Sequence, residues 1–131
     1  MTKISNWVVC SIPVPPLPAS RPRVGRWGVF YAKTYLNWRK AADESLKKLR
    51  LPLTSRPLDV ELTQVCKKPK TTKRLWPRGD VDNHAKAVLD AITRAPFGWE
   101  DDDQIITLKV TKRYAEDEKP RSEIRWRPVT L

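Results

Sequence analysis

The chain of 131 residues carries a formal net charge of +11 and has an isoelectric point near 10.0. Its length suits one domain over residues 1–131, because domains usually hold roughly 100–150 residues, and a hydrophobic content of 40% suffices for a buried core. No window approaches the roughly 20 apolar residues of a membrane-spanning helix, and no apolar segment of a secretory signal stands near the start. We therefore expect a cytoplasmic protein and exclude the secreted and membrane-spanning classes.

The two cysteines, Cys10 and Cys66, are too few for a disulfide framework and lack the spacing of zinc ligands. We predict that both are reduced thiols in the core. A zinc-finger protein is therefore excluded.

The first half of the chain alternates predicted strands with loops. A strand is predicted over residues 7–13, where β-branched residues end at a proline. The proline-rich segment 13–20 suits a polyproline-like connector better than a docking peptide for a partner. Segment 20–31 is interpreted as a basic loop that leads into a short aromatic strand. Thr34 is expected to N-cap a helix that extends to about Leu49. The residues at helical spacing in it are Tyr35, Trp38, Ala42, Ser45, Leu46 and Leu49.

A linker, a strand and a loop are predicted next. Segment 51–57 is interpreted as a linker within the domain, and the alternation over residues 58–67 predicts a strand. Segment 68–79 is expected to be a basic loop, because prolines interrupt it.

The second predicted helix is the clearest element of the sequence. Its apolar stripe comprises Val81, Ala85, Val88, Leu89 and Ile92. The helix is expected to end near Arg94, because Pro96 disfavours helical backbone at Ala95. A strand over residues 104–114, a charged turn and a final strand over 123–129 follow, and the last two strands are expected to pair as a hairpin. This order predicts a single-domain α/β (α+β) fold, a mixed sheet carrying two helices.

Basic and acidic residues are separated along the chain rather than mixed. Segment 62–79 contains no acid, whereas seven of the fifteen acids fall between Asp80 and Asp103. The basic residues of segment 62–79 are Lys67, Lys68, Lys70, Lys73, Arg74 and Arg78. The excess of positive charge is typical of a protein that binds a polyanion. Since a phosphate-binding protein gains nothing from concentrated carboxylates unless they have a role, the acids mark a candidate site.

The acidic residues form two groups. Asp80 and Asp82 stand at the start of the second helix, where helix capping alone is the alternative explanation. Asp82, Lys86 and Asp90 are spaced four residues apart and share one ridge of the helix, with an exposed row of ion pairs as the alternative. Four further acids occupy residues 100–103. A hard cation such as Mg²⁺, which takes oxygen ligands, would relieve their repulsion.

The two acidic groups together resemble the RusA family of Holliday-junction resolvases. The residues that carry the resemblance are Asp-x-Asp-Asn-x-x-Lys-x-x-x-Asp over 80–90 and Asp-Asp-x-Gln-Ile over 101–105, and it is strongest over 78–110. The resemblance implies a RusA-like fold and a small, homodimeric, Mg²⁺-dependent DNA endonuclease of the kind frequent in phages and prophages. Such a protein would act in a bacterial or phage-infected cell, with Mn²⁺ as a substitute for Mg²⁺.

The resemblance also assigns roles to residues. The metal-binding and catalytic acids fall on Asp80, Asp82 and Asp102, and the active-site lysine falls on Lys86. The residues expected to support them are Asn83, Asp90 and Asp101. The connection at residues 95–99 is one residue longer than in the family pattern, so Asp101 and Asp103 stay open as alternatives to Asp102.

The remaining basic and aromatic residues are expected to contact DNA or the core. Backbone-phosphate contacts are predicted for Arg21, Arg23, Lys67, Lys68, Lys70, Lys73, Arg74 and Arg78. Trp27 and Trp76 lie in basic loops, where they either stack on bases or are ordinary surface residues. Core or interface positions are predicted for Trp7, Trp38, Trp99 and Trp126. His84, the one histidine, is directed away from the helix ridge, so we expect it at the rim of the site or against the DNA backbone rather than in catalysis.

The main hypothesis is a structure-selective endonuclease that resolves four-way DNA junctions by paired nicks in recombination and repair. Mg²⁺ held by carboxylates suits this hydrolysis, because it orients water and stabilises the attacking and leaving oxygens. Two alternatives remain open, a non-catalytic basic nucleic-acid-binding protein and a nuclease without preference for junctions.

Overall fold

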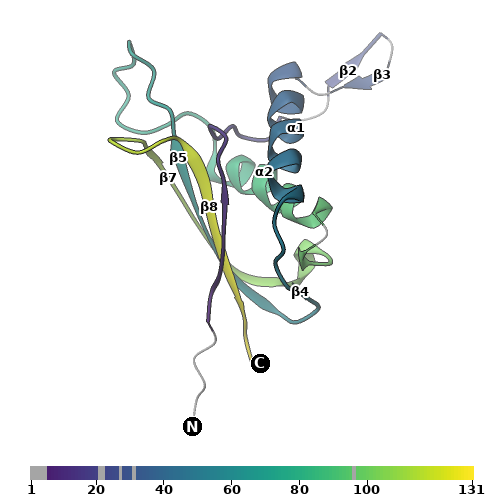
Figure 1. The fold of residues 1–131 in the computed structure, drawn as a ribbon. Helices are drawn as coiled ribbons and strands as arrows, with labels where there is room; N and C mark the ends of the chain where they lie inside the picture. Colours follow the sequence, from purple (N-terminus) through teal and green to yellow (C-terminus); the bar gives the residue numbers. More distant parts are fainter. Residues whose placement is uncertain (1–5, 21–22, 27, 31, 96) are drawn as a thin grey trace.

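The computed structural model describes residues 6–20, 23–26, 28–30, 32–95 and 97–131, and shows a mixed sheet with two helices on one face (Figure 1). The sheet has four strands in the order β1–β8–β5–β7. The bounds of these strands are Val8–Ile12 for β1, Arg121–Pro128 for β8, Leu58–Cys66 for β5 and Ile105–Tyr114 for β7. The predicted α+β fold is confirmed.

The pairing of the last two strands differs from the prediction. β8 does not form a hairpin with β7; it runs antiparallel to β1 and to β5, and β7 runs parallel to β5. In β8 the alternating residues Ser122, Ile124 and Trp126 are all buried, which suits an interior strand. By contrast, Ile106 and Leu108 of β7 are exposed, because this strand forms the edge of the sheet. The hairpin prediction was therefore wrong.

The two helices pack on the same face of the sheet and against each other. The first helix, α1, covers Lys33–Lys47 and buries four of the predicted residues, Tyr35, Trp38, Ala42 and Leu46. Its N-cap is Ala32, and Thr34 lies inside the first turn, so the predicted cap is wrong. Arg94 of the second helix donates to Asp43 of α1 at 2.9 Å and links the two helices.

The second helix, α2, covers Val81–Arg94 and ends where the sequence predicts. Ala85, Val88 and Ile92 of the predicted stripe are buried, and the buried face also includes Ala87 and Ala91, which are completely buried. Leu89 is only half-buried, and Val81 is 46% exposed at the helix start. The alanines let the helix lie close to the sheet, whereas the ridge that carries Asp82 stays in solvent.

Two short strand pairs stand outside the main sheet. The antiparallel pair of β2 (Arg23–Gly25) and β3 (Gly28–Phe30) replaces the single aromatic strand that was predicted, and it projects beyond α1 (Figure 1). The parallel pair of β4 (Leu53–Thr54) and β6 (Gly98–Trp99) lies partly within the predicted linker. This second pair joins the start of β5 to the loop after α2.

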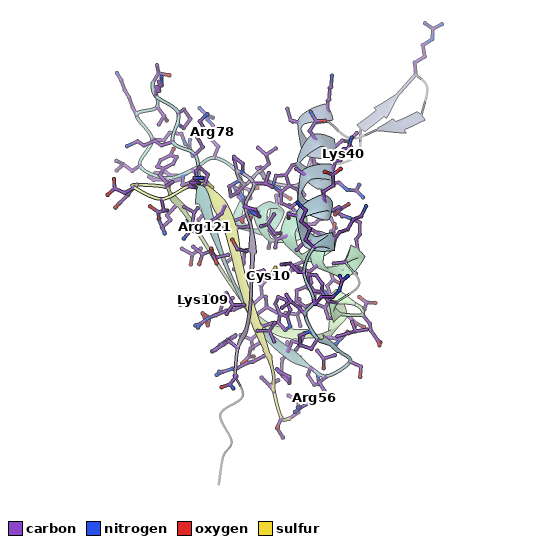
Figure 2. The ribbon with its side chains drawn as sticks, in the orientation of Figure 1. Cys10, Lys40, Arg56, Arg78, Lys109 and Arg121 are labelled. Carbon is purple, nitrogen blue, oxygen red and sulfur yellow. The ribbon has the colours of Figure 1, made fainter. Side chains whose placement is uncertain are left out.

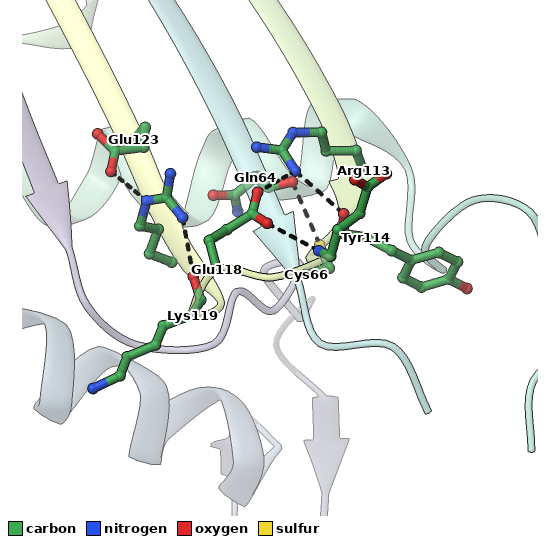
Figure 3. Close-up of polar contacts among 9 residues, drawn as sticks. Gln64, Cys66, Arg113, Tyr114, Glu118, Lys119 and Glu123 are labelled. Carbon is green, nitrogen blue, oxygen red and sulfur yellow. Dashed lines mark hydrogen bonds and ion pairs between the residues drawn. The ribbon is translucent and has the colours of Figure 1, made fainter. Parts of the chain in front are cut away.

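The core lies between the helices and the sheet. Cys10 and Cys66 are both buried free thiols, as predicted, and burial raises the pKa of each to about 11. The opposite face of the sheet carries ion pairs across neighbouring strands, among them Arg125 with Glu61 at 2.8 Å. Figure 3 shows further pairs at the turn between β7 and β8, where Arg113 contacts Glu118. No helix in the described part of the chain is long and apolar enough to span a membrane.

Candidate active site

The acidic loop (residues 100–103), which follows α2 in the chain, lies close to that helix. A short 3₁₀ turn, η1 (Asp102–Gln104), contacts α2. Partial burial raises the pKa of Asp102, and the nearby carboxylates of Asp101 and Asp90 raise it further, whereas Lys86 opposes the shift. Lys86 is itself paired with Asp90 at 3.3 Å. The structure thus gathers one lysine and three acids from two separate segments into one acidic cluster: Lys86, Asp90, Asp101 and Asp102.

The side chain of Gln104 fixes the conformation of the acidic loop. Its Oε1 accepts hydrogen bonds from the backbone N–H of Glu100 at 2.8 Å and of Asp101 at 3.0 Å. Its Nε2 donates to the carbonyls of Thr54 and Arg56, both at 2.9 Å, and so joins the loop to the segment before β5. Sequence reasoning used Gln104 only as a motif residue and missed this role, although its fixed place after the acids was the available signal.

Within the loop, the acids differ in what holds them. Asp101 accepts a hydrogen bond from the backbone N–H of Asp103 at 3.1 Å and thereby caps the 3₁₀ turn. Asp102 follows it inside the turn, and partial burial together with the charges of Asp101 and Asp90 raises the pKa of its carboxyl group. Of the three candidates for the ligand, Asp102 is therefore the one whose surroundings are most clearly shared with α2.

The two acids at the start of α2 are exposed. Asp80 occupies the N-cap position but makes no side-chain capping hydrogen bond. Asp82 accepts a hydrogen bond from the backbone N–H of its neighbour Asn83 at 2.9 Å. The carbonyl of Asn83 accepts from the N–H of Ala19 in the proline-rich connector at 2.8 Å. Capping therefore does not explain Asp80, and its carboxylate remains accessible from solvent.

The donor set fits a hard divalent cation by its chemistry. Asp80, Asp82 and Asp102 offer carboxylate oxygens, the ligand type that Mg²⁺ prefers. Over the described residues, no three or more His, Cys, Asp or Glu side chains form a group that could hold a metal ion. Mg²⁺ is usually bound by one or two carboxylates, with waters and substrate phosphates as the other ligands. The assignment of these three residues as ligands stays a prediction.

His84 is buried rather than at the rim of the site. It is 1% exposed, and its ring lies between Gln64 Nε2, at 3.2 Å from Nδ1, and the carbonyl of Arg78, at 3.0 Å from Nε2. Burial lowers its pKa, and the positive charge of Lys112 lowers it further. The predicted position at the rim or against DNA was wrong, because the helix face that carries His84 turns towards β5.

The segment that leads into Asp80, which we term the strap (residues 76–79), is bound by side chains. The Tyr114 hydroxyl donates to the carbonyl of residue 76 at 2.9 Å. The Lys112 ammonium donates to the carbonyl of residue 77 at 2.7 Å and also to that of Gly79. The carbonyl of Arg78, which lies between these two residues, is bound by the ring of His84. Sequence reasoning missed Lys112, Tyr114 and Gln64, although the alternation of β7 placed Lys112 on the inward face.

The basic segment 67–79, which ends in the strap, presents its cations to solvent. Lys67, Lys68, Lys70, Lys73 and Arg78 are exposed, and Arg74 is half-buried. The Arg74 guanidinium lies 5.6 Å from the ring centre of Trp76, which is itself 58% exposed. Arg78 lies at one end of the sheet, and Arg56 at the other (Figure 2). Arg21 and Trp27 lie outside the described residues, and the side chain of Arg23 is not described.

The other tryptophans divide between the core and the surface. Trp38, Trp99 and Trp126 are buried as predicted, and the rings of the last two meet edge to face at 5.4 Å. Trp7 is half-buried, and the guanidinium groups of Arg125 and Arg127 lie 4.2 Å and 4.4 Å from its ring. Trp7 therefore packs against arginines on the charged face of the sheet rather than in the core.

Comparison with known proteins identifies the family. No curated protein matches the chain. The family model described as Endodeoxyribonuclease RusA matches residues 13–127, from the proline-rich connector into β8. This match sets aside the non-catalytic binding protein that the sequence left open. The chain belongs to the RusA family of endodeoxyribonucleases and is a Holliday-junction resolvase that hydrolyses DNA.

Proposed function

We propose that this nuclease cleaves four-way junctions by paired nicks, with Mg²⁺ bound by Asp80, Asp82 and Asp102 and with Mn²⁺ as a substitute. The observation that carries the proposal is the contact of η1, which contains Asp102, with α2, which contains the Lys86–Asp90 ion pair. Carboxylates gathered at one place repel one another, and a bound divalent cation relieves that repulsion.

Each side chain has a defined part in the proposed reaction. When bound, Mg²⁺ activates water and stabilises the charge of the phosphodiester transition state. Lys86, whose side chain is 65% exposed, reaches towards a non-bridging phosphate oxygen. Asp90, one turn further along α2, holds the Lys86 ammonium at 3.3 Å and limits the orientations it adopts. Asp101 keeps the loop folded, so that Asp102 stays beside the helix.

The basic loop supplies affinity for the DNA backbone in this proposal. Its exposed lysines and arginines neutralise phosphates, and Arg21 and Arg23 are expected to do the same. Trp76 and Trp27 stack on bases at the open centre of a junction, since a tryptophan ring accepts any base. Trp76 meets this requirement through its exposed ring, which an arginine already flanks.

Paired nicks require two active sites on symmetry-related strands, so we propose that the enzyme is a homodimer. It would act in recombination and repair in the cytoplasm of a bacterial or phage-infected cell. Equilibrium sedimentation of the purified chain, with and without junction DNA, tests this part. A chain that stays monomeric on the junction would contradict it.

The proposed function is tested by incubating the purified protein with a four-way junction labelled on each strand in turn. We expect nicks in opposing strands with Mg²⁺ or Mn²⁺ and none with EDTA. An excess of unlabelled linear duplex should leave cleavage nearly unchanged, whereas an unlabelled junction should abolish it. Equal competition by linear duplex would indicate a nuclease without preference for junctions.

A further inference from the structure

The strap is an irregular segment whose backbone carbonyls are bound by side chains. All four of its consecutive carbonyls accept hydrogen bonds from side chains, namely those of Tyr114, Lys112 and His84, and Arg74 Nε also donates to the carbonyl of residue 76 at 3.3 Å. Two of these donors come from β7, which lies more than thirty residues away in the sequence. The last carbonyl of the strap belongs to the residue directly before Asp80, so the strap sets where the first acid of the site stands.

Lys112 is the central donor. Among the described residues, none of the ion pairs includes Lys112, and its half-buried ammonium is bound by two carbonyls of the strap. A partly buried cation is costly unless its hydrogen bonds are satisfied, so the lysine and the strap stabilise each other's position. The loss of this ammonium would leave two carbonyls without a donor.

The strap also lacks room to shift. Gly79 has φ of +95°, a conformation that other residues rarely adopt. A Cβ atom at Gly79 would lie 2.9 Å from Pro18 and 3.0 Å from His84 Nε2. Gly79 is thus enclosed between the proline-rich connector and α2, and the hydrogen bond from Ala19 to Asn83 holds the connector in place.

We propose that Lys112 and Tyr114 are positioning residues of the nuclease, which fix the strap and so hold Asp80 and Asp82 in the arrangement that binds the metal. This inference rests on the proposed function, since it requires that these two acids bind the cation. Neither residue touches the scissile phosphate in this view. Their loss would therefore raise the Mg²⁺ concentration that the enzyme needs for cleavage.

The test compares Lys112→Met with Lys109→Met. Both lysines belong to β7, and Lys109 extends from the opposite face of the sheet, away from the helices (Figure 2). The two variants therefore remove the same charge from the same strand. The cleavage rate at saturating junction is measured against Mg²⁺ concentration, together with junction affinity in EDTA and the melting temperature.

We expect Lys112→Met to raise the half-saturating Mg²⁺ concentration about tenfold or more, a typical effect of losing a residue that orients metal ligands. The rate should recover at high Mg²⁺, and junction affinity should change no more than in Lys109→Met. Lys112→Arg should restore part of the loss, because a guanidinium also donates to carbonyls. An unchanged metal requirement in folded Lys112→Met, or an equal shift in Lys109→Met, would overturn the inference.

Tyr114→Phe keeps the proposal testable if Lys112→Met does not fold. It removes one hydrogen bond to the strap at almost constant volume, so a smaller rise in the same Mg²⁺ requirement is expected, and no rise would contradict the proposal. Different results would show that the proposed metal-dependent function itself is wrong. In that case the wild-type enzyme would cleave without added metal, or Asp80→Asn would retain full activity at every Mg²⁺ concentration.

Discussion

The acidic loop carries Asp102 and the strap leads directly into Asp80, but the two segments are held in different ways. In the loop, Gln104 binds backbone N–H groups three and four residues away. In the strap, the donors Lys112 and Tyr114 lie 33 to 38 residues from their acceptors. The loop is therefore closed by hydrogen bonds within its own sequence and joined to Thr54 and Arg56 by the same side chain, whereas the strap depends on donors from β7.

This difference has consequences for folding and for catalysis. The local hydrogen bonds of the loop close a short segment, which costs little conformational entropy. The strap requires the parallel pairing of β5 and β7, and such long-range contacts form late because their closure entropy must be overcome first. A substitution that weakens the pairing of β7 with β5 should thus displace Asp80 and Asp82 more than it displaces Asp102.

The largest expected effect comes from removing one carboxylate on the strap side. Asp82→Asn keeps the size of the side chain and caps a helix about as well as Asp. We expect cleavage to fall to the level measured in EDTA, while junction binding persists or tightens because a negative charge near the phosphates is removed. Gel-shift and cleavage assays on the same junction measure both. If Asp82 acted only on the helix terminus, activity would stay near that of the wild type.

The same assay compares the two regions directly. Asp80→Asn on the strap side and Asp102→Asn on the loop side should resemble Asp82→Asn, whereas Asp103→Asn should be milder. Should Asp103 prove indispensable and Asp102 replaceable, the longer connection before the loop has shifted the register of the motif.

The sequence predicted those parts of the molecule whose signals are local. The alternation in β5, the end of α2 before Pro96, and the spacing of Asp82, Lys86 and Asp90 depend on neighbours in the chain, and all are found in the structure. The position of β8 between β1 and β5 was not predictable, because a hairpin with β7 satisfies the same alternation. His84 was misplaced for a related reason, since only the contact with Gln64 of β5 shows which face of α2 is buried.

A second prediction concerns the loop. Gln104→Ala removes the acceptor for two backbone N–H groups and the donor for two carbonyls, most of them exposed, so we expect it to destabilise the fold by about 0.5–1.5 kcal/mol per hydrogen bond lost. Cleavage should slow as well, because Asp102 loses its fixed place beside α2. Gln104→Glu keeps the acceptor but places a charged oxygen against the carbonyls of Thr54 and Arg56, so it should be at least as destabilising as Gln104→Ala. Urea unfolding and cleavage rates test this, and equal stability of all three proteins would contradict it.

A third prediction uses the buried imidazole beside the strap. Burial lowers the pKa of His84 below its ordinary value of 6.5. The unfolded chain therefore binds a proton more readily than the folded one, and the stability present above pH 6.5 is lost as the pH falls below it. His84→Gln should show a weaker loss of stability over this interval than the wild type. Unfolding free energies measured on both sides of pH 6.5 test this, and identical pH dependence would contradict it.

The smallest effect per residue is expected in the basic loop that precedes the strap. If Lys67, Lys70 and Lys73 contact phosphates, replacing all three with Ala should weaken binding to every junction sequence. The slope of log affinity against log salt should flatten by about 0.9 for each phosphate that is no longer neutralised. The matched control replaces Lys40, Lys47 and Lys48 on or just after α1, which removes the same charge elsewhere, and it should flatten the slope less. Filter binding from low to moderate salt gives both slopes. Equal slopes in the two variants would mean that overall charge, rather than this loop, accounts for the affinity.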